Sequence, residues 1–545
     1  MRERVFLFLR ILFGVFLGGI LFLLLFFSGE DYLFKKSFVF SNVAIVMIFL
    51  CIIFMGTLIY ISCVKCKDFI AQKRETFNSR INQAVKKNKF VKICYEFVRK
   101  FYDMDRFVLC FCIFMFFLQI FVCYNIYFSS GWDVANVLGA ANCMVNGDAE
   151  GLELYETYFS RYPNNLAITY IYALILRVAK IFVPEFAVFS LIVLNCVINS
   201  MTILLVYKTT KFFGSKRIAF FATNLVVILV GLSPWVVICY TDSLSLFVPI
   251  LSFYLYGRRF NNESNNSRFI YRLAAVAIAT FGYCIKPQCA IVLIAIVLIE
   301  SVYMYKELSE KNIKKMVSIG VVVVCTLMCT RGTIALGNKV TNFDLDNNKK
   351  FGIIHFLNMS VNEKTQGGYC QEDVEVSSGC NNVKERNRVN LNSFNNRIKK
   401  MGFVGIINHL KKKSLMTYND GSFAWGAEGE FYINISNYNT KISKTLKGLC
   451  YDTSCNYKYL SSVQQFVWIV VLILAFLSCF VEKNFKRRKG LAILWLSMLG
   501  LIIYEIFFEA RARYLYIYVP LLCVIASVGT GVLCSFIKEK CKRIL

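Results

Sequence analysis

The sequence predicts an all-α polytopic membrane protein with about 12 (11 to 13) transmembrane helices, outer juxtamembrane helices and a small extracytoplasmic domain. Hydrophobic residues make up 57% of the 545 residues, and aromatic residues make up 16%. Apolar runs recur at about the 20 residues that a helix needs to cross a hydrocarbon core about 30 Å thick. Basic and acidic loops alternate between these runs. These features exclude a secreted enzyme, a disordered chain and a β-barrel.

The first predicted helix is the N-terminal run MRERVFLFLRILFGVFLGGILFLLLFF. It starts with basic residues but lacks an A-x-A-like cleavage site, which indicates an uncleaved signal anchor. The further predicted crossings are residues 38–63, 107–129, 186–207, 217–238, 243–257, 268–285, 288–304, 315–331, 463–481, 490–507 and 514–536.

The charges of the connecting loops set the expected orientation. The stretch 64–106 holds 12 basic and 5 acidic residues, whereas the loop 130–164 holds five acidic residues and one basic residue, Arg161. Because Lys and Arg are retained in cytoplasmic loops, we expect both termini in the cytoplasm of a plasma membrane and the loop 130–164 outside. The formal net charge of +28 is then explained by the Lys and Arg residues of the cytoplasmic loops, so no nucleic-acid partner is expected.

One further apolar segment, residues 166–183, is long enough to cross the membrane. A crossing there would invert every later loop and leave the polar region 332–462 in the cytoplasm. We therefore expect this segment to lie along the outer surface or to dip in only partly, with Arg177 and Lys180 on one helical face.

The crossings and loops predict five regions. They are two N-terminal transmembrane helices (1–63), a basic cytoplasmic loop (64–106), a transmembrane core with the acidic outer loop (107–331), an extracytoplasmic domain (332–462), and C-terminal transmembrane helices with a basic tail (463–545).

Within the predicted outer domain, the spacings of Cys370 with Cys380 and of Cys450 with Cys455 allow two local disulfides if the domain faces an oxidising compartment. Trp425 is either a core residue or a sugar-stacking residue, and the core is the favoured interpretation.

Ionisable residues cluster near the outer ends of the predicted crossings. Such groups are costly at membrane depth and usually face a cavity or a charged partner. Each has a structural interpretation as well: Asp133 as a helix cap, Lys286 as an interfacial residue, Glu505 and Glu509 as partners of nearby arginines. Segments far apart in the chain nevertheless place these groups at one depth: Asp133, Arg161, Asp242, Lys286, Glu505, Glu509, Arg511 and Arg513.

Five features in this order resemble the GT-C superfamily of membrane glycosyltransferases, which take a sugar from a polyprenyl-phosphate carrier. They are Asp133 in the first large outer loop, the Arg-Tyr-Pro string at 161–165, the Tyr-Thr-Asp and Lys-Pro interruptions at 240–242 and 286–287, and the Glu-Ala-Arg-Ala-Arg-Tyr-Leu segment at 509–515 followed by Pro520. The pattern is most similar to bacterial relatives of protein O-mannosyltransferases and lipid A aminoarabinose transferases. It covers most of residues 107–331 and 463–536.

The chain departs from that pattern in three respects, one of which is that the predicted outer domain precedes the last three helices. Many relatives have a second proline in the Arg-Tyr-Pro string, where this chain has Asn164. Two additional crossings precede the matching part.

The resemblance implies an inverting transferase that moves a sugar from a polyprenyl-phosphate carrier to an acceptor hydroxyl at the outer face, in the modification of cell-envelope glycans or glycopolymers. The acceptor must lose a proton as it attacks, and Asp133 is the candidate general base. Cations would offset the charge of the departing phosphate. The candidate substrate- and phosphate-binding residues are Arg161, Tyr162, Asn164, Asn165, Tyr240, Asp242, Lys286, Gln288, Glu505, Glu509, Arg511, Arg513 and Tyr514.

The expected partners are the lipid-linked sugar donor, a glycan, lipid or protein acceptor, and the bilayer. No cofactor is required and no metal ligands are assigned, although the chemistry allows a divalent cation. Asp344 and Asp346 match a D-x-D pattern, which we interpret as an ordinary acidic turn.

Three other functions remain open: a transporter or lipid flippase, an oligosaccharide polymerase or ligase, and a membrane scaffold. The polar groups collect at one face, whereas transporters often place their sites near the midplane. The basic segment 384–413 keeps the polymerase or ligase open.

Overall fold

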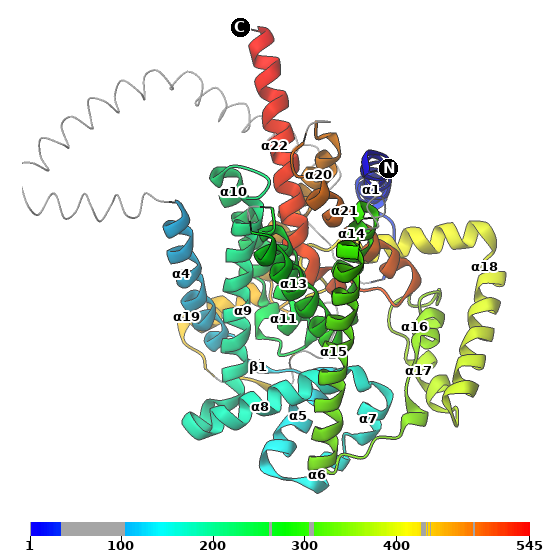
Figure 1. Cartoon of the computed structure of the whole chain (residues 1–545). Helices are drawn as coiled ribbons and strands as arrows, with labels where there is room; N and C mark the ends of the chain where they lie inside the picture. The colour runs from blue at the N-terminus through cyan, green and yellow to red at the C-terminus, as the bar shows by residue number, and fades with distance from the viewer. Residues whose placement is uncertain are drawn as a thin grey trace, which may run out of the picture.

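The computed structural model of the chain describes residues 2–33, 104–260, 264–304, 310–426, 432, 434–436, 438–482 and 485–544. The predicted crossing 38–63 and almost all of the predicted loop 64–106 lie outside these residues. The described part is almost entirely helical (Figure 1), and its strands β1 (Phe128–Ser129) and β2 (Asn434–Ile435) form one short antiparallel pair. The all-α class is therefore confirmed.

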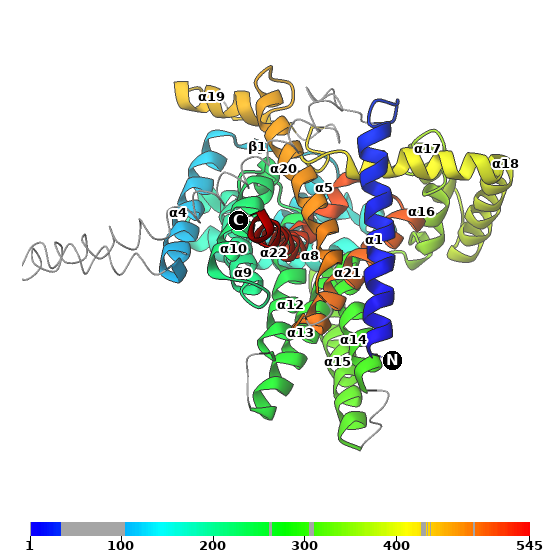
Figure 2. The ribbon, with the colours of Figure 1, turned by 90° about the horizontal axis from the view of Figure 1, so that it is seen from above.

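Nine helical segments in the described part of the chain are long and apolar enough to cross a membrane. Figure 2 shows α22 end-on near the centre of the molecule, with α20 beside it and α1 on the far side of α20. The shorter apolar helix α14 (Ala290–Met304) packs against α21. The nine segments contain α1 (Arg2–Phe27), α4 (Met104–Asn125), α8 (Leu166–Phe182), α9 (Ala187–Thr210), α13 (Asn265–Ile285), α15 (Glu310–Thr341), α20 (Tyr457–Leu477), α21 (Arg488–Phe507) and α22 (Val519–Ile544).

Two of the predicted crossings are not continuous helices. The predicted crossing 217–238 consists of α10 (Lys216–Val226), a π-helical turn (Val227–Gly231) and a 3-10 turn (Pro234–Val237). Pro234 has no N–H to continue the helix and disfavours helical geometry at the residue before it. The predicted crossing 243–257 consists of α11 (Thr241–Ser245) and α12 (Phe247–Arg258). The predictions of single long helices were wrong, and the breaks leave irregular backbone beside Tyr240 and Asp242.

Helix α8 contains the apolar segment that we expect to lie along the surface. Its length and composition would also allow a crossing. Figure 1 shows α8 running across α9 and α15, not parallel to them. Its Lys180 donates a hydrogen bond to Asn146 in α5 (Trp132–Asn146), at 2.6 Å. The surface position of this segment stays a prediction.

Helices α16 (Ile353–Met359), α17 (Gln371–Ser378) and most of α18 (Val383–Tyr418) form a lobe to the right in Figure 1. A small apolar cluster of Phe351, Met359, Cys370 and Val374 lies inside it. The buried Arg386 donates hydrogen bonds to four backbone carbonyls and so ties the loops of this lobe together.

The rest of the predicted outer region joins the main core. Helix α15 continues ten residues beyond the predicted end of its crossing at 331. Trp425 is completely buried against Trp235, and its indole N–H donates to the Cys450 carbonyl at the end of α19 (Lys441–Cys450). The interpretation of Trp425 as a core residue is confirmed.

All four cysteines considered for disulfides are free thiols in the structure. The whole of α17 separates Cys370 from Cys380, about 12 Å along the helix axis, and a disulfide needs Cα atoms within about 7 Å. Cys450 is buried at the end of α19, whereas Cys455 is exposed with its thiol toward Asn456. Neither of the two disulfides that the spacings would allow is formed in the structure.

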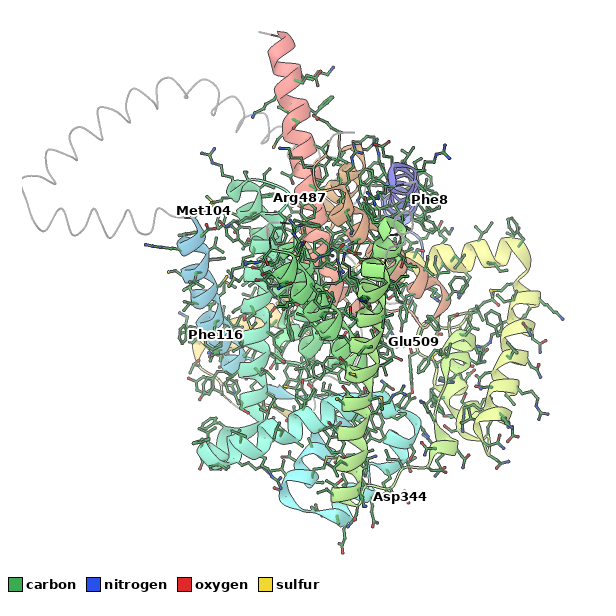
Figure 3. The ribbon with its side chains drawn as sticks, viewed as in Figure 1. Phe8, Met104, Phe116, Asp344, Arg487 and Glu509 are labelled. Carbon is green, nitrogen blue, oxygen red and sulfur yellow. The ribbon has the colours of Figure 1, made fainter. Side chains whose placement is uncertain are left out.

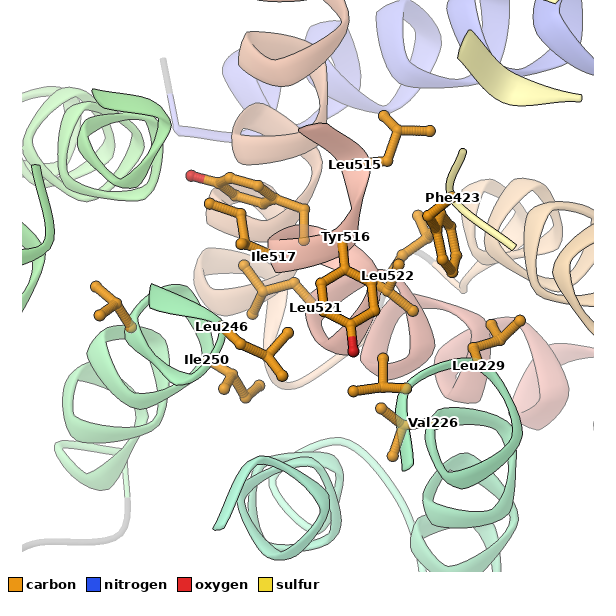
Figure 4. Close-up of a cluster of buried hydrophobic side chains, with 14 of the residues drawn as sticks. Val226, Leu229, Leu246, Ile250, Phe423, Leu515, Tyr516, Ile517, Leu521 and Leu522 are labelled. Carbon is orange, nitrogen blue, oxygen red and sulfur yellow. The ribbon is translucent and has the colours of Figure 1, made fainter. Parts of the chain in front are cut away.

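A core of aliphatic and aromatic side chains lies under the irregular segments (Figure 4). Val226 and Leu229 from α10 and its π turn, and Leu246 near α11, face Tyr516 and Leu521. All of these residues are buried. The core supports the 3-10 segment Ala512–Tyr518, which carries Arg513 and Tyr514.

Gly529 brings α22 against α20 with no room for a side chain. A Cβ atom there would lie 1.7 Å from the Leu474 carbonyl oxygen. Gly529→Ala should destabilise the protein by about 1–3 kcal/mol, because backbone must shift. Gly531→Ala is the matched control, since its Cβ would lie 3.9 Å from Ile218. Thermal unfolding in detergent measures both, and equal melting temperatures would show that this contact is not tight.

Acid should weaken the lobe through His355. This side chain is 1% exposed and lies 2.7 Å from the Ser377 hydroxyl, and burial lowers its pKa to about 4. In the unfolded chain the histidine pKa is near 6.5, so between pH 6.5 and pH 4 the unfolded chain binds a proton that the folded chain does not. The free energy of unfolding therefore falls by roughly 3 kcal/mol as the pH drops from about 6.5 to 4. Melting temperature against pH should fall less steeply for His355→Gln, which retains His409. Equal slopes of melting temperature against pH in the wild type and in His355→Gln would refute the role of His355 in acid sensitivity.

Candidate functional site

The candidate site begins at the first turn of α5. Gly131 precedes the helix and no side chain caps it, so Asp133 does not serve as the helix cap. Trp132 has a φ of 38°, an uncommon value for a residue with a side chain. The Asp133 carboxylate is therefore available for contacts with other segments.

Two tyrosine hydroxyls bind the Asp133 carboxylate, one to each oxygen. Tyr158 in α7 (Glu156–Arg161) donates to Oδ1 at 2.7 Å, and Tyr240 donates to Oδ2 at 2.9 Å. Asn165 lies between them, with its amide 2.6 Å from the Tyr158 hydroxyl and its Oδ1 3.4 Å from that of Tyr240. Burial raises the pKa of Tyr158 well above its usual value, so its hydroxyl remains a donor. These bonds hold the carboxylate in one orientation.

A buried ionic cluster forms where α11 and the end of α13 meet the 3-10 segment Ala512–Tyr518. The Lys286 ammonium lies 2.8 Å from Asp242 Oδ1, and the Arg513 Nε lies 3.7 Å from Oδ2. Asp242 is completely buried. Lys286 has extended backbone between α13 and the 3-10 turn Pro287–Cys289, because Pro287 disfavours helix at the preceding residue. Asp242 thus orients two cations.

Arg513 connects this cluster with Asp133. Its guanidinium carbon lies 4.8 Å from the centre of the Trp132 ring and 5.8 Å from that of Tyr240, the same tyrosine that binds Asp133. Such contacts stabilise a cation against an aromatic face. The structure therefore brings Asp133, Asn165, Tyr240, Asp242, Lys286 and Arg513 into one connected network.

The segment after α21 adds a second pair of charges, and Figure 3 labels its Glu509. Arg511 Nε lies 3.8 Å from Glu509 Oε1, and the Tyr514 hydroxyl donates to the same oxygen at 3.3 Å. The Tyr514 ring lies 4.8 Å from the Lys286 ammonium. The expected pairing of glutamate with arginine thus exists for Glu509, within reach of the ionic cluster.

Glu505 has a different environment from the one we expected. It is 3% exposed, and neither carboxylate oxygen makes a hydrogen bond of good geometry in the described part of the chain. Its charged neighbours are Lys413 and Lys286, of opposite charge, and Glu509, of the same charge; the backbone of Arg511 also lies close to it. Glu505 therefore faces lysines and not a neighbouring arginine side chain.

Three other predicted residues lie at the margin of the network. The Tyr162 ring packs 5.3 Å from those of both Tyr158 and Phe351. Asn164 is exposed, and its side-chain amide donates a hydrogen bond to Asn165 Oδ1 at 3.2 Å. Arg161 is half-buried; its carbonyl accepts from Phe351.

Gln288 is the last of the predicted residues. Its side chain is buried, and its carbonyl accepts from the Tyr518 hydroxyl at 2.8 Å. This contact uses the backbone carbonyl, so it assigns the Gln288 side chain no part in a binding site.

Sequence reasoning missed Tyr158, Tyr369 and Lys413. The buried Lys413 ammonium donates to the carbonyls of Ser360, Ile506 and Phe508, and burial lowers the pKa of Lys413 to about 8. It therefore ties the lobe to the end of α21.

Burial, together with the charges of Asp133 and Glu509, raises the pKa of Tyr369. Tyr369 follows the loop in which the Gly367 carbonyl accepts a hydrogen bond from the Ala510 amide at 2.9 Å, next to Arg511. In the sequence, Tyr158 is one of many tyrosines and Lys413 one of three adjacent lysines, so composition could not single out either residue.

The D-x-D tripeptide forms the acidic turn that we expected. Asp346 caps the 3-10 turn Asn347–Lys349 by accepting from the Asn348 amide at 2.9 Å. Among the described residues, no group of three or more His, Cys, Asp or Glu side chains could hold a metal ion. A cleft of about 620 Å³ opens beside this turn, between α7 and the end of α15.

The long apolar helices and the buried ionic network at one end of them define a polytopic α-helical membrane protein. The chain belongs to a family described as "Conserved hypothetical integral membrane protein", whose model matches residues 87–531.

No curated protein matches the sequence. The structure is similar to that of the archaeal oligosaccharyltransferase AglB from Archaeoglobus fulgidus in complex with an inhibitory peptide and a dolichol-phosphate, at 11% identity and a TM-score of 0.39. The match covers 80% of this chain and 52% of that one, so the chain spans about half the length of AglB. A likeness of this extent does not establish a shared fold or activity.

Proposed function

We propose that the protein is an inverting glycosyltransferase of the GT-C type, which moves a sugar from a polyprenyl-phosphate carrier to an acceptor hydroxyl. One observation carries the proposal: Tyr158 and Tyr240 hold the Asp133 carboxylate, and the ring of the same Tyr240 lies 5.8 Å from the Arg513 guanidinium carbon. A base next to cations is what an attack on a sugar phosphate requires.

In the proposed step, the acceptor oxygen attacks the anomeric carbon while its proton passes to Asp133. The new bond is the glycosidic C–O bond, and the bond that breaks joins the anomeric carbon to the phosphate oxygen. The electron pair of that bond leaves with the polyprenyl phosphate. A single displacement of this kind inverts the anomeric centre.

The cations near Asp133 would offset the charge on the leaving phosphate. Arg511 and Arg513 can offer two parallel N–H groups, whereas Lys286 acts as a point charge. Asp242 holds Lys286 and Arg513 in place before the donor arrives. This preorganisation reduces the rearrangement needed during the reaction.

Aromatic side chains around the network suit a sugar ring. The rings of Trp132, Tyr240 and Tyr514 lie around Arg513, and Tyr162 packs against Tyr158, which binds Asp133. Each of these four side chains offers an apolar face with a polar group. The cleft beside α7 has polar lining from Ser160, Asn338 and Asp346, and we assign it to the acceptor.

We place the reaction at the outer face of a bacterial plasma membrane, with both termini in the cytoplasm, and we assign the donor to a polyprenyl monophosphate. No cofactor is needed for this step, and a divalent cation would add to the positive charge that the side chains supply.

A profile of lipid-linked sugars in cells with and without the protein tests this function. Cells lacking the protein should accumulate a polyprenyl-phosphate sugar and lose one glycan modification. An unchanged lipid profile, together with counterflow of a labelled solute in liposomes and no glycosylated product, would overturn the transferase in favour of a transporter.

A further inference from the structure

A second ionic cluster is buried at the other end of the helix bundle. Glu300 in α14 is 1% exposed and lies 2.6 Å from Arg259 Nη1 and 2.8 Å from the Lys489 ammonium. Arg272 Nη2 in α13 lies 3.7 Å from the same carboxylate, and Tyr256 donates its hydroxyl to it. We call these residues the Glu300 cluster.

The cluster lies far from the Asp133 network. Lys489 lies in the first turn of α21 and Glu505 in its last, about 24 Å apart at a rise of about 1.5 Å per residue. Arg272 precedes the end of α13 at Ile285 by about 20 Å. Arg487, which Figure 3 labels near the start of α21, lies at the cluster end, and Glu509 lies at the opposite end.

The Glu300 cluster carries more positive charge than Glu300 can balance. Three cations converge on this one carboxylate in the described part of the chain. Buried charges without neutralising partners are strongly destabilising, and they are usually paired or bind a ligand of opposite charge.

Several donors of the cluster are also unsatisfied. Arg272 is only 5% exposed, and within the described part of the chain its Nε and Nη1 atoms have no hydrogen-bond partner; the same is true there of Arg259 Nε. Buried polar groups in native proteins are nearly always hydrogen-bonded. The guanidinium fork matches the oxygens of a phosphate group.

We propose that the Glu300 cluster binds a phosphate group, and that the source is the headgroup of an anionic phospholipid. The cluster lies near the ends of α12, α13, α14 and α21, of which α13 and α21 are long and apolar enough to cross a membrane. Lipid headgroups meet a membrane protein at the ends of its crossing helices. The bound phosphate would accept hydrogen bonds from Arg272 and Arg259 and balance the excess charge. This site is independent of the proposed sugar transfer.

The test uses the full-length protein purified in a neutral detergent. Mixed micelles containing phosphatidylglycerol should raise the melting temperature of the wild type, and micelles with phosphatidylcholine should not. Inorganic phosphate is the third arm: a rise with phosphate alone would assign the site to a free anion and overturn the lipid source. No rise in any arm would overturn the site.

Variants then locate the effect. Arg272→Gln should weaken the apparent affinity for phosphatidylglycerol by roughly tenfold or more, since it removes charged donors. Arg177→Gln, at an exposed arginine of α8 outside the Glu300 cluster, should leave the affinity unchanged. Equal effects of the two variants would contradict the assignment.

Glu300→Gln provides a second, opposite test should Arg272→Gln fail to fold. This change removes the carboxylate and keeps all three cations, so phosphatidylglycerol should bind more tightly and stabilise the variant more than it stabilises the wild type. A self-sufficient ion network would instead lose stability with no gain in the response to lipid, and that result would overturn the proposal.

Discussion

Asp133→Asn is expected to lower the turnover of sugar transfer by about 10²- to 10⁴-fold, the usual contribution of a general base. Asparagine has nearly the same shape and can still bond to Tyr158 and Tyr240, so the fold should be retained. Donor binding should change little, because the cations remain. Initial rates at saturating donor, with melting temperature as the check on folding, measure the effect.

A matched control comes from the same loop, residues 130–164. Asp148 accepts a hydrogen bond from Gly151 at the start of α6 (Ala149–Glu153), away from the Asp133 network. Asp148→Asn should leave turnover nearly unchanged. If Asp133→Asn retains full activity, the assignment of Asp133 as the base is wrong.

Lys286→Met is expected to reduce the free energy of unfolding by about 3–5 kcal/mol, because it leaves the buried Asp242 carboxylate without its closest partner. Binding of a phosphate-bearing donor should weaken as well. Unfolding in detergent measures the first effect. Lys458→Met, at an exposed lysine, should be neutral.

A double variant distinguishes the lost charge pair from lost packing. Asp242→Asn combined with Lys286→Met removes both charges, so stability should recover in large part relative to Lys286→Met alone. Equal stability of the single and double variants would mean that the pair is not coupled.

The continuous helices could be predicted from the sequence because each needs only an apolar run of sufficient length. This rule located α4, α9, α13 and α21 to within a few residues. It could not show that α10 ends in π and 3-10 turns, since an apolar run looks the same in either conformation. Pro234 was the sequence feature that indicated the end of this helix.

The convergence of the site was also predictable in part. Asp133, Asp242, Lys286 and Arg513 each interrupt or border an apolar segment, and this placed them at one depth. Their partners were not predictable, because Tyr158 and Lys413 look like ordinary polar residues in the chain. Contacts between distant segments depend on helix packing, which spacing along the sequence does not encode.

Product analysis with purified protein tests the central claim most directly. The protein in detergent receives an acceptor and a labelled polyprenyl-monophosphate sugar. We expect one free polyprenyl phosphate for each glycosidic bond formed, and an inverted anomeric configuration in the product. Retention of configuration, or turnover only with a nucleotide sugar, would contradict the account.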